Sequence, residues 1–161
     1  MGGPDLSEEA ESKLEVSLEP ATTQDVPALL EWMRDFYVHE DIPFDPAVSE
    51  PVLRELLARP ELGRVLKLVA GGHAVGYAVL AFGFSLEFGG RSLFLDELYV
   101  RPPWRGRGIG TIALRLLQET SRDLGARSLA LEVNLDNVGA ERLYRREGFT
   151  SNRRQLMTRR L

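Results

Sequence analysis

The segment RGRGIG at residues 105–110 combines three glycines with two arginines. It follows a strand-like apolar run over residues 92–100 and opens a helical pattern over residues 107–125. A strand, a glycine-rich loop and a helix suit an anion, because glycines let the backbone come close and the first helical amides point into one concavity. The sequence therefore predicts a strand-loop-helix unit with an anion beside it.

The anion expected beside this loop is a pyrophosphate. Each hydrogen bond to a charged group contributes about 1.5–3 kcal/mol, whereas an exposed helix dipole contributes about 0.3–1 kcal/mol. The loop amides, together with Arg105 and Arg107, should therefore dominate the binding. Two nucleotide motifs do not fit: Thr111 stands where the dinucleotide fingerprint needs glycine, and no lysine follows Lys67 for a P-loop. A glycine turn that only caps a helix is the alternative.

The rest of the chain mixes strand and helix patterns, which predicts a mixed α/β fold. Alternating or short apolar runs predict strands at residues 14–21, 64–70, 73–85, 92–100 and 128–133, and closing strands at 149–151 and 154–161. Apolar residues at helical spacing predict helices at residues 23–37, 52–58, 107–125 and 137–148.

Three further expectations concern the organisation of the chain. Residues 39–51 are rich in proline and acid, which predicts a loop. The strand-helix-strand crossover at residues 92–133 should be parallel and right-handed. Residues 1–13 are acidic with few bulky apolar groups, which predicts a flexible tail before a single domain over residues 14–161.

Composition excludes several classes of site. The chain has no cysteine, which excludes disulfides, thiolate metal sites and a cysteine nucleophile. Its two histidines, His39 and His73, lack metal-binding spacing, so we expect no metal. The N-terminus has no signal-peptide pattern, and the longest uncharged stretch, residues 74–86, is too short for a membrane span. We therefore expect a cytoplasmic protein without membrane contact.

The charge is divided unevenly along the chain. Residues 1–90 contain 16 acidic and 6 basic residues, whereas residues 91–161 contain 8 acidic and 14 basic ones. The basic half contains the glycine loop, so its charge suits an anionic ligand. The whole chain has a net charge of −4, which argues against nucleic acid as a partner.

Two spaced patterns carry the clearest signal. The first, Arg-x-x-Gly-x-Gly, consists of Arg105, Gly108 and Gly110. The second, Asn-x-x-Ala-x-x-Leu-Tyr-x-x-x-Gly-Phe, consists of Asn137, Ala140, Leu143, Tyr144, Gly148 and Phe149. Both resemble motifs of the GNAT superfamily of acyl-CoA-dependent N-acetyltransferases, whose order of elements fits residues 14–161. The part before Ser92 resembles the family only in layout. The resemblance implies a mixed sheet of six to seven strands, flanked by helices and splayed where acetyl-CoA binds.

The resemblance also implies which residues hold acetyl-CoA. The backbone of Leu98, Tyr99 and Val100 would pair with the amides of the pantetheine arm. Asn137 would hydrogen-bond the cofactor with Ala140 beside it, and Asn134 is a weaker candidate. The pyrophosphate would lie against the loop residues Arg105, Gly106, Arg107, Gly108, Ile109, Gly110 and Thr111.

The chemistry that the resemblance implies is direct transfer. An amine attacks the thioester in a ternary complex, because no cysteine is present to form an acyl-enzyme. A backbone N–H near Leu98 would hold the oxyanion, and Tyr144 would protonate the leaving thiolate. Tyr144 lies seven residues after Asn137, on the same helical face. The alternative is a buried tyrosine whose hydroxyl is satisfied within the protein.

A base is also needed, because an alkyl ammonium is mostly protonated at neutral pH. Asp96 and Glu97 are neighbours in a predicted strand, so their side chains point to opposite faces and only one can address the acceptor. Periodicity does not decide between them; Glu97 is the first candidate, Asp96 the second and His39 the third. A carboxylate paired with Arg91 or Arg101, or a plain surface histidine, is the alternative.

The acceptor is expected to be a small amine. The acidic segment 40–45 and the aromatic residues Trp32, Phe36 and Tyr37 come from the part of the chain that borders the acceptor site in the family. An acidic, aromatic mouth suits a cationic amine such as a polyamine, basic amino acid, aminoglycoside-like amine or peptide N-terminus. Alternatively, the aromatics belong to the core and the acids to a solvated rim.

The sequence thus predicts an acetyl-CoA-dependent N-acetyltransferase. A non-catalytic acyl-CoA-binding module that regulates or senses is the alternative function, and a homodimer is left open.

Overall fold

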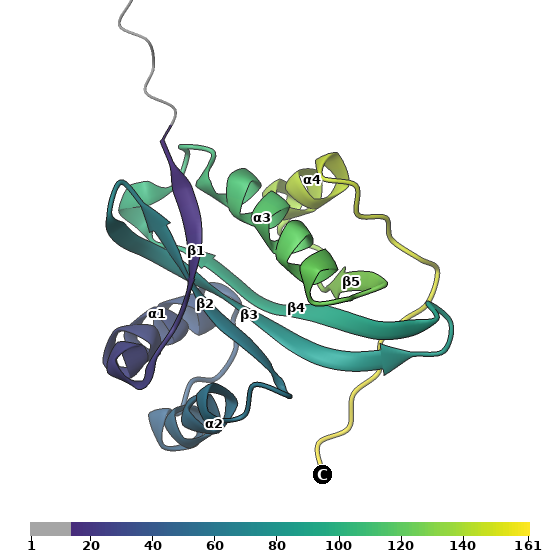
Figure 1. Cartoon of the computed structure of the whole chain (residues 1–161), viewed down its shortest axis with the longest axis horizontal. Helices are drawn as coiled ribbons and strands as arrows, with labels where there is room; N and C mark the ends of the chain where they lie inside the picture. The colour runs from purple at the N-terminus through teal and green to yellow at the C-terminus, as the bar shows by residue number, and fades with distance from the viewer. Residues whose placement is uncertain (1–13) are drawn as a thin grey trace, which may run out of the picture.

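The computed structural model describes residues 14–161, so the tail predicted at residues 1–13 lies outside the described residues. One sheet has α1 and α2 against one face and α3 and α4 against the other (Figure 1), which confirms the mixed α/β fold. The strands are β1 (Val16–Pro20), β2 (Gly63–Ala70), β3 (His73–Ser85), β4 (Gly90–Val100) and β5 (Ser128–Leu131). The helices are α1 (Val26–His39), α2 (Pro46–Ala58), α3 (Ile109–Asp123) and α4 (Val138–Arg146), with 3-10 turns at Thr23–Asp25 and Pro102–Trp104.

The strands of the sheet lie in chain order, β1-β2-β3-β4-β5. The first four pair antiparallel, and β5 pairs parallel to β4, as predicted for the crossover at residues 92–133. Gly71 and Gly72 have φ angles of 56° and 78°, which only glycine adopts easily, and they form the tight turn between β2 and β3. The sheet has five strands in the described residues, fewer than the six to seven expected.

The predicted closing strands at 149–151 and 154–161 are wrong, because the described residues after α4 form no strand. The tail contains few apolar side chains, and they bury little: Leu156 is 70% and Met157 86% exposed. A segment that buries so little apolar surface cannot offset the entropy lost on ordering it into a sheet.

The prediction of a loop over residues 39–51 is wrong in its second half. Helix α2 begins at Pro46, six residues before the predicted start at Val52. Asp45 caps it, because its carboxylate accepts a hydrogen bond from the Ala47 amide at 2.9 Å. Pro46 suits a first helical position, where no amide hydrogen is needed, whereas Pro51 inside the helix gave the segment its loop-like composition.

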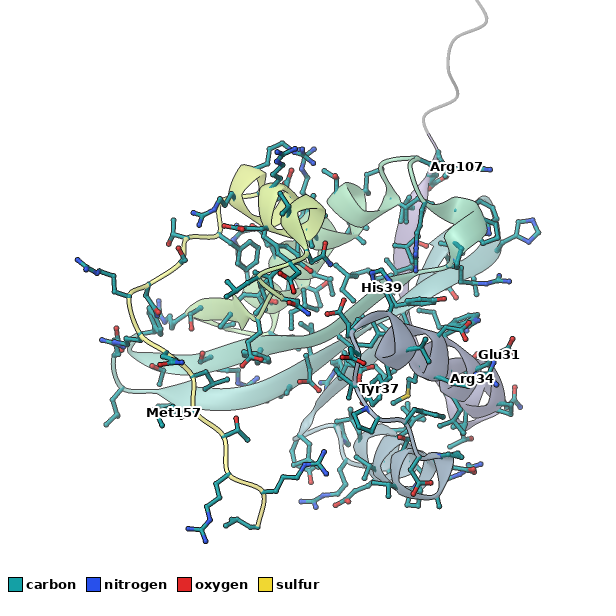
Figure 2. The ribbon with its side chains drawn as sticks, turned by 180° about the vertical axis from the view of Figure 1, so that it is seen from behind. Glu31, Arg34, Tyr37, His39, Arg107 and Met157 are labelled. Carbon is teal, nitrogen blue, oxygen red and sulfur yellow. The ribbon has the colours of Figure 1, made fainter. Side chains whose placement is uncertain are left out.

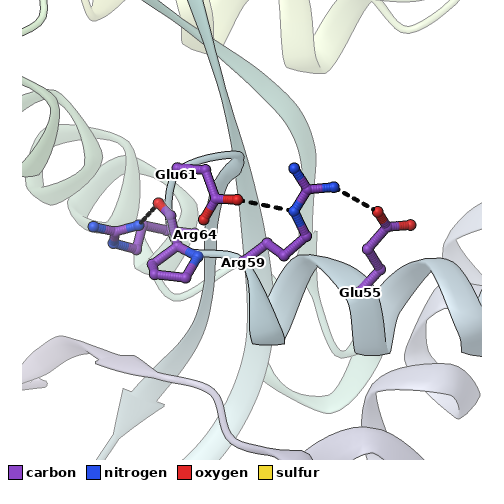
Figure 3. A network of polar contacts seen from close by, with 5 residues as sticks. Glu55, Arg59, Glu61 and Arg64 are labelled. Carbon is purple, nitrogen blue, oxygen red and sulfur yellow. Dashed lines mark hydrogen bonds and ion pairs between the residues drawn. The ribbon is translucent and has the colours of Figure 1, made fainter.

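A polar network joins the end of α2 to the start of β2 (Figure 3). The Arg59 guanidinium donates to Glu55 and to Glu61 at 2.9 Å each. Arg64 donates to the carbonyl of Pro60 in the same turn. These groups are exposed to solvent, so the network contributes little to stability and lies apart from the site described below.

Both faces of the sheet are covered by helices. On one face, Leu29 of α1 packs in a cluster with Tyr77 and other strand residues. On the other face, Leu114 of α3 packs with Leu93 and Leu95 of β4. The central strands are therefore buried on both sides, so a polar residue in them needs a partner or a cavity.

Strand β4 contains a bulge that reverses its inside-outside pattern. Val79 of β3 pairs with Glu97, and the next residue, Leu80, pairs with Leu95, so Asp96 is an extra residue without a partner on β3. Leu95 faces α3, whereas Glu97 contacts Tyr37 of α1.

The sheet opens where β4 and β5 part. The two strands pair only from Ser92 with Ser128 to Leu95 with Leu131. Strand β4 then continues over Asp96–Val100 without a β5 neighbour, which confirms the predicted splay. Among residues 14–161, no helix combines the length and apolar character that crossing a membrane requires.

Candidate functional site

Two connected cavities lie where β4 and β5 separate. The first, here called the loop cavity, has a volume of about 360 Å³ and lies beside the glycine loop and the start of α3. The second, here called the acidic cavity, has a volume of about 420 Å³ and lies between the end of α1, β4 and the segment after β5. Both cavities are lined by six of the same residues: Phe36, Glu40, Asp96, Glu132, Val133 and Asn134.

The glycine loop has the conformation that an anion site needs. Gly106 and Gly108 have φ angles of 74° and 76°, and Gly108 is the N-cap of α3. A left-handed residue at this point turns the chain sharply into α3, whose first two residues line the loop cavity and whose first amides have no partner within the helix. Ile109, by contrast, is buried and anchors the helix start to the sheet.

The two arginines of the loop play different structural roles. The Arg105 Nε–H donates to the Val100 carbonyl at 2.7 Å, and its guanidinium lies over the ring of Tyr99. Arg105 therefore ties the loop to the end of β4. The Arg107 guanidinium lies over Trp104 instead, and Figure 2 shows its side chain at the outer edge of the molecule.

Most of the predicted site residues meet at the loop cavity. Arg107 and Thr111 do not line it, although they belong to the same loop and helix start, and Glu97 lines only the acidic cavity. The predicted catalytic and cofactor-binding residues that do line it are His39, Asp96, Leu98, Tyr99, Val100, Arg105, Gly106, Gly108, Ile109, Gly110, Asn134, Asn137, Ala140 and Tyr144.

Asn137 is the N-cap of α4. Its side-chain oxygen accepts a hydrogen bond from the Ala140 amide at 3.1 Å, and the residue lines the loop cavity. Asn134 makes a similar local bond, since its Oδ1 accepts from the Asp136 amide at 3.2 Å. In both asparagines the side-chain oxygen is thus used within the protein, and the NH₂ group remains available as a donor.

Tyr144 of α4 lines the loop cavity and packs its ring edge-on against Phe149. Its hydroxyl makes no side-chain hydrogen bond with the residues that the structure describes, so the alternative of a satisfied core tyrosine gains no support from them. Burial raises the pKa of Tyr144, and the negative charge of Glu40 raises it further. The hydroxyl therefore stays protonated at neutral pH and can donate a proton.

Glu97 is the buried carboxylate of the site, with 6% of its surface exposed. Its two oxygens accept hydrogen bonds from the hydroxyls of Tyr37 at 2.7 Å and Tyr77 at 2.6 Å. Burial raises the pKa of Glu97, although the two tyrosine hydrogen bonds act in the opposite direction. Its charge also raises the pKa of both tyrosines, after the larger effect of their own burial. Glu97 is thus held in a fixed position with both oxygens engaged.

Asp96, the bulge residue, opens to both cavities. Desolvation by the surrounding protein raises the pKa of its carboxyl. Neither arginine proposed as an ion-pair partner reaches Asp96 or Glu97 in the described structure. Arg91 donates to the Leu124 carbonyl at 2.9 Å, and Arg101 donates to the Ala74 carbonyl at 3.1 Å.

The end of α1 borders both cavities. His39, the last residue of α1, is exposed and lines the loop cavity (Figure 2). Phe36 lines both cavities and Tyr37 the acidic one, yet both rings also pack against the core on this face. Phe36 and Tyr37 therefore belong to the core and also border the cavities, so the two alternatives predicted for them do not exclude each other. Trp32 lies under the guanidinium of Arg101 and lines neither cavity.

Sequence reasoning missed three residues of the site. Glu132 lines both cavities, and its signal was a single charge inside the apolar run SLALEV, which ends as a strand at Leu131. Trp104 lines the loop cavity, and Tyr77 holds Glu97 from the neighbouring strand. The contact between Tyr77 and Glu97 depends on how β3 and β4 are aligned, and no local sequence pattern predicts that alignment. The described residues contain no cluster of His, Cys, Asp and Glu suited to a metal ion.

Comparison with known proteins shows to which family the chain belongs. Residues 26–149 match the Acetyltransferase (GNAT) family. The chain belongs to this family. This GNAT chain is 32% identical over 114 residues to aminoglycoside N(6')-acetyltransferase type 1 of Stenotrophomonas maltophilia, which covers 68% of the chain and 74% of that relative.

A second curated relative, thialysine N-epsilon-acetyltransferase of Bos taurus, is 36% identical over 78 residues, and the chain spans only 45% of its length. That match covers 48% of the chain. Among solved structures, an integron cassette protein from the mobile metagenome of Cole Harbour Salt Marsh is 35% identical with a TM-score of 0.78. That match covers 89% of this chain and 90% of the other. The predicted GNAT family, fold and class of acyl-CoA-dependent N-acetyltransferase are confirmed.

Proposed function

We propose that this GNAT protein transfers the acetyl group of acetyl-CoA to a primary amine by direct attack in a ternary complex. The observation that carries the proposal is the unpaired stretch of β4, residues 96–100, which ends beside the glycine loop while Tyr144 faces the same cavity. The site thus offers an anion loop for the pyrophosphate of acetyl-CoA, an exposed strand edge for its pantetheine arm and a proton donor for its thioester.

The residues present fit acetyl-CoA. The amides at the start of α3 would hold the pyrophosphate, because Gly106 and Gly108 let the backbone approach closely. Arg105 already engages the Val100 carbonyl, so the backbone of Leu98 and Tyr99 would pair with the pantetheine arm. The Asn137 NH₂ would add a hydrogen bond from α4. Bound acetyl-CoA would supply a thioester, whose acyl carbon is open to attack by an amine.

Asp96 is the proposed base for the acceptor. It opens to both cavities, whereas both oxygens of Glu97 are occupied by tyrosine hydroxyls. Desolvation raises the pKa of Asp96, which makes it a better proton acceptor than an ordinary aspartate. Glu97 then acts as a positioning residue that fixes the bulge of β4, and His39 is the other base within the loop cavity.

Residues of this chain can carry out two of the proton transfers that accompany acetyl transfer. Asp96 first takes a proton from the ammonium, and the freed amine lone pair then bonds the acyl carbon. As the carbon–sulfur bond breaks, Tyr144 gives a proton to the leaving thiolate. The nitrogen loses its second proton to solvent, and solvent returns a proton to Tyr144. A backbone N–H near Leu98 would stabilise the developing oxyanion.

A thiol-release assay with acetyl-CoA and a panel of amines tests this function. We expect Tyr144→Phe to lower turnover on the order of 10²-fold or more, because a general acid contributes that much, and to leave CoA affinity unchanged by calorimetry. Binding of CoA without thiol release from any amine would identify the chain as a non-catalytic acyl-CoA-binding module. Absence of CoA binding would contradict both functions.

A further inference from the structure

The acidic cavity carries a charge pattern that the transfer of a single amino group does not require. Four of its lining residues are carboxylates, Glu40, Asp96, Glu97 and Glu132, and among the described residues that line it there is no lysine, arginine or histidine. The cavity opens directly from the place where Asp96 would face the attacking amine. Its volume of about 420 Å³ suits a small-molecule ligand.

Two of these carboxylates already have a role. Glu97 is engaged by Tyr37 and Tyr77, and Asp96 is the proposed base. Glu40 and Glu132 form no side-chain hydrogen bond or ion pair with the described residues. Glu40 lies at the end of α1 and Glu132 follows β5, so two different elements bring these carboxylates to one cavity.

The remaining walls of the acidic cavity are mostly apolar or aromatic. Phe36 and Tyr37 come from α1, Ile42 from the loop that follows, and Phe94 from β4. Aromatic faces attract cations, and apolar side chains cover the methylene groups that separate one amine from the next. The cavity thus offers both carboxylates for charge and apolar surface for a carbon spacer.

We propose that the acceptor is a small polycationic amine whose reacting amino group lies at Asp96 while a second cationic group is held by Glu40 and Glu132 in the acidic cavity. This inference rests on the proposed function, and it names the acceptor class by its chemistry. An amine with one charge leaves two carboxylates facing an empty cavity, whereas an amine with a second charge pairs with both.

The test compares an α,ω-diamine with the primary monoamine of the same chain length, using acetyl-CoA and thiol release. A hydrogen bond to a charged group contributes about 1.5–3 kcal/mol, so kcat/KM should favour the diamine by on the order of tenfold or more. The double variant Glu40→Gln, Glu132→Gln should lower this preference toward one. The control Glu119→Gln removes one charge from the exposed face of α3, outside both cavities, and should retain the preference.

Equal kcat/KM for the diamine and the monoamine, or a preference that survives the double substitution, would overturn the inference while leaving acetyl transfer intact. If no amine releases thiol, the proposed function fails instead. Calorimetry then decides on the cavity, because the diamine should bind the CoA-saturated protein on the order of tenfold more tightly than the monoamine does. Equal affinities in that titration would overturn the inference as well.

Discussion

Asp96 and Glu132 are the first residues of their two segments beyond the last paired positions of β4 and β5, Leu95 and Leu131. Both line both cavities. The parallel strands thus separate at a pair of carboxylates, and charged side chains favour contact with solvent or a cation over burial in a sheet. The opening of the sheet and the acidic lining of the site therefore begin at the same two residues.

Asp96→Asn should lower kcat/KM for amine acetylation on the order of 10²-fold or more, because a general base contributes that much. In the wild type, activity falls as pH drops and Asp96 takes up a proton, and the raised pKa places this decline above the pH expected of an exposed aspartate. The variant should lack that acid limb, as a pH–rate profile would show.

Asp123→Asn, at the end of α3, is the matched control for this substitution and should keep the acid limb. An unchanged limb in Asp96→Asn would assign the base to another group, with His39 the next to test.

Asn137 allows its two roles to be separated. Asn137→Asp keeps the oxygen that caps α4 but replaces the NH₂ donor with an acceptor, so CoA affinity should fall on the order of tenfold with little change in stability. Asn137→Ala should lose both roles and also lower the free energy of unfolding by about 1 kcal/mol. Calorimetry and urea unfolding check the two effects, and full CoA affinity in Asn137→Asp would contradict the donor role.

Gly108→Ala should lower both stability and CoA affinity. The φ of 76° costs an L-residue about 1–2 kcal/mol, although an added Cβ meets no protein atom within 4 Å. Gly139→Ala is the matched control, because Gly139 lies inside α4 without a positive φ and alanine favours a helix. A Gly108→Ala protein that is as stable and binds CoA as tightly as the wild type would show that the loop does not need this conformation.

Glu97→Gln should change the pH dependence of stability. The pKa of Glu97 is raised above its ordinary value of 4.5 in the folded state, so the folded state binds the proton more tightly than the unfolded state. The free energy of unfolding of the wild type therefore declines as pH rises from 4.5 through the folded pKa. The variant should lack this part of the decline, as urea unfolding across that range would measure. A parallel decline in both proteins would mean that Glu97 is not the group responsible.

The sequence predicted the cofactor side of the site better than the acceptor side. The loop around Gly108 and the start of α4 at Asn137 are local patterns, in which conformation and residue type determine each other over a few positions. Local patterns could not predict contacts between residues that are brought together by the alignment of neighbouring strands. The side on which Asp96 and Glu97 lie depends on a bulge opposite Val79 and Leu80, and no feature of the run LDELYV marks it.

The errors at the ends of elements have the same cause. Pro51 gave the start of α2 the composition of a loop, because a proline inside a helix is rare unless packing against neighbours compensates for it. The tail after Phe149 alternates enough to resemble a strand, but a strand also needs a neighbour to pair with and a face to bury. Both requirements depend on the rest of the fold, so the local sequence pattern does not show whether they are met.

Arg105 fixes a length as well as a contact. By donating to the Val100 carbonyl, it joins the glycine loop to the free end of β4, five residues away along the chain. In the proposed complex with acetyl-CoA, the protein itself would then set the distance between the pyrophosphate and the acyl group. A CoA analogue whose arm is longer or shorter by a few atoms would still bind its phosphates, but it would present its acyl group away from Asp96.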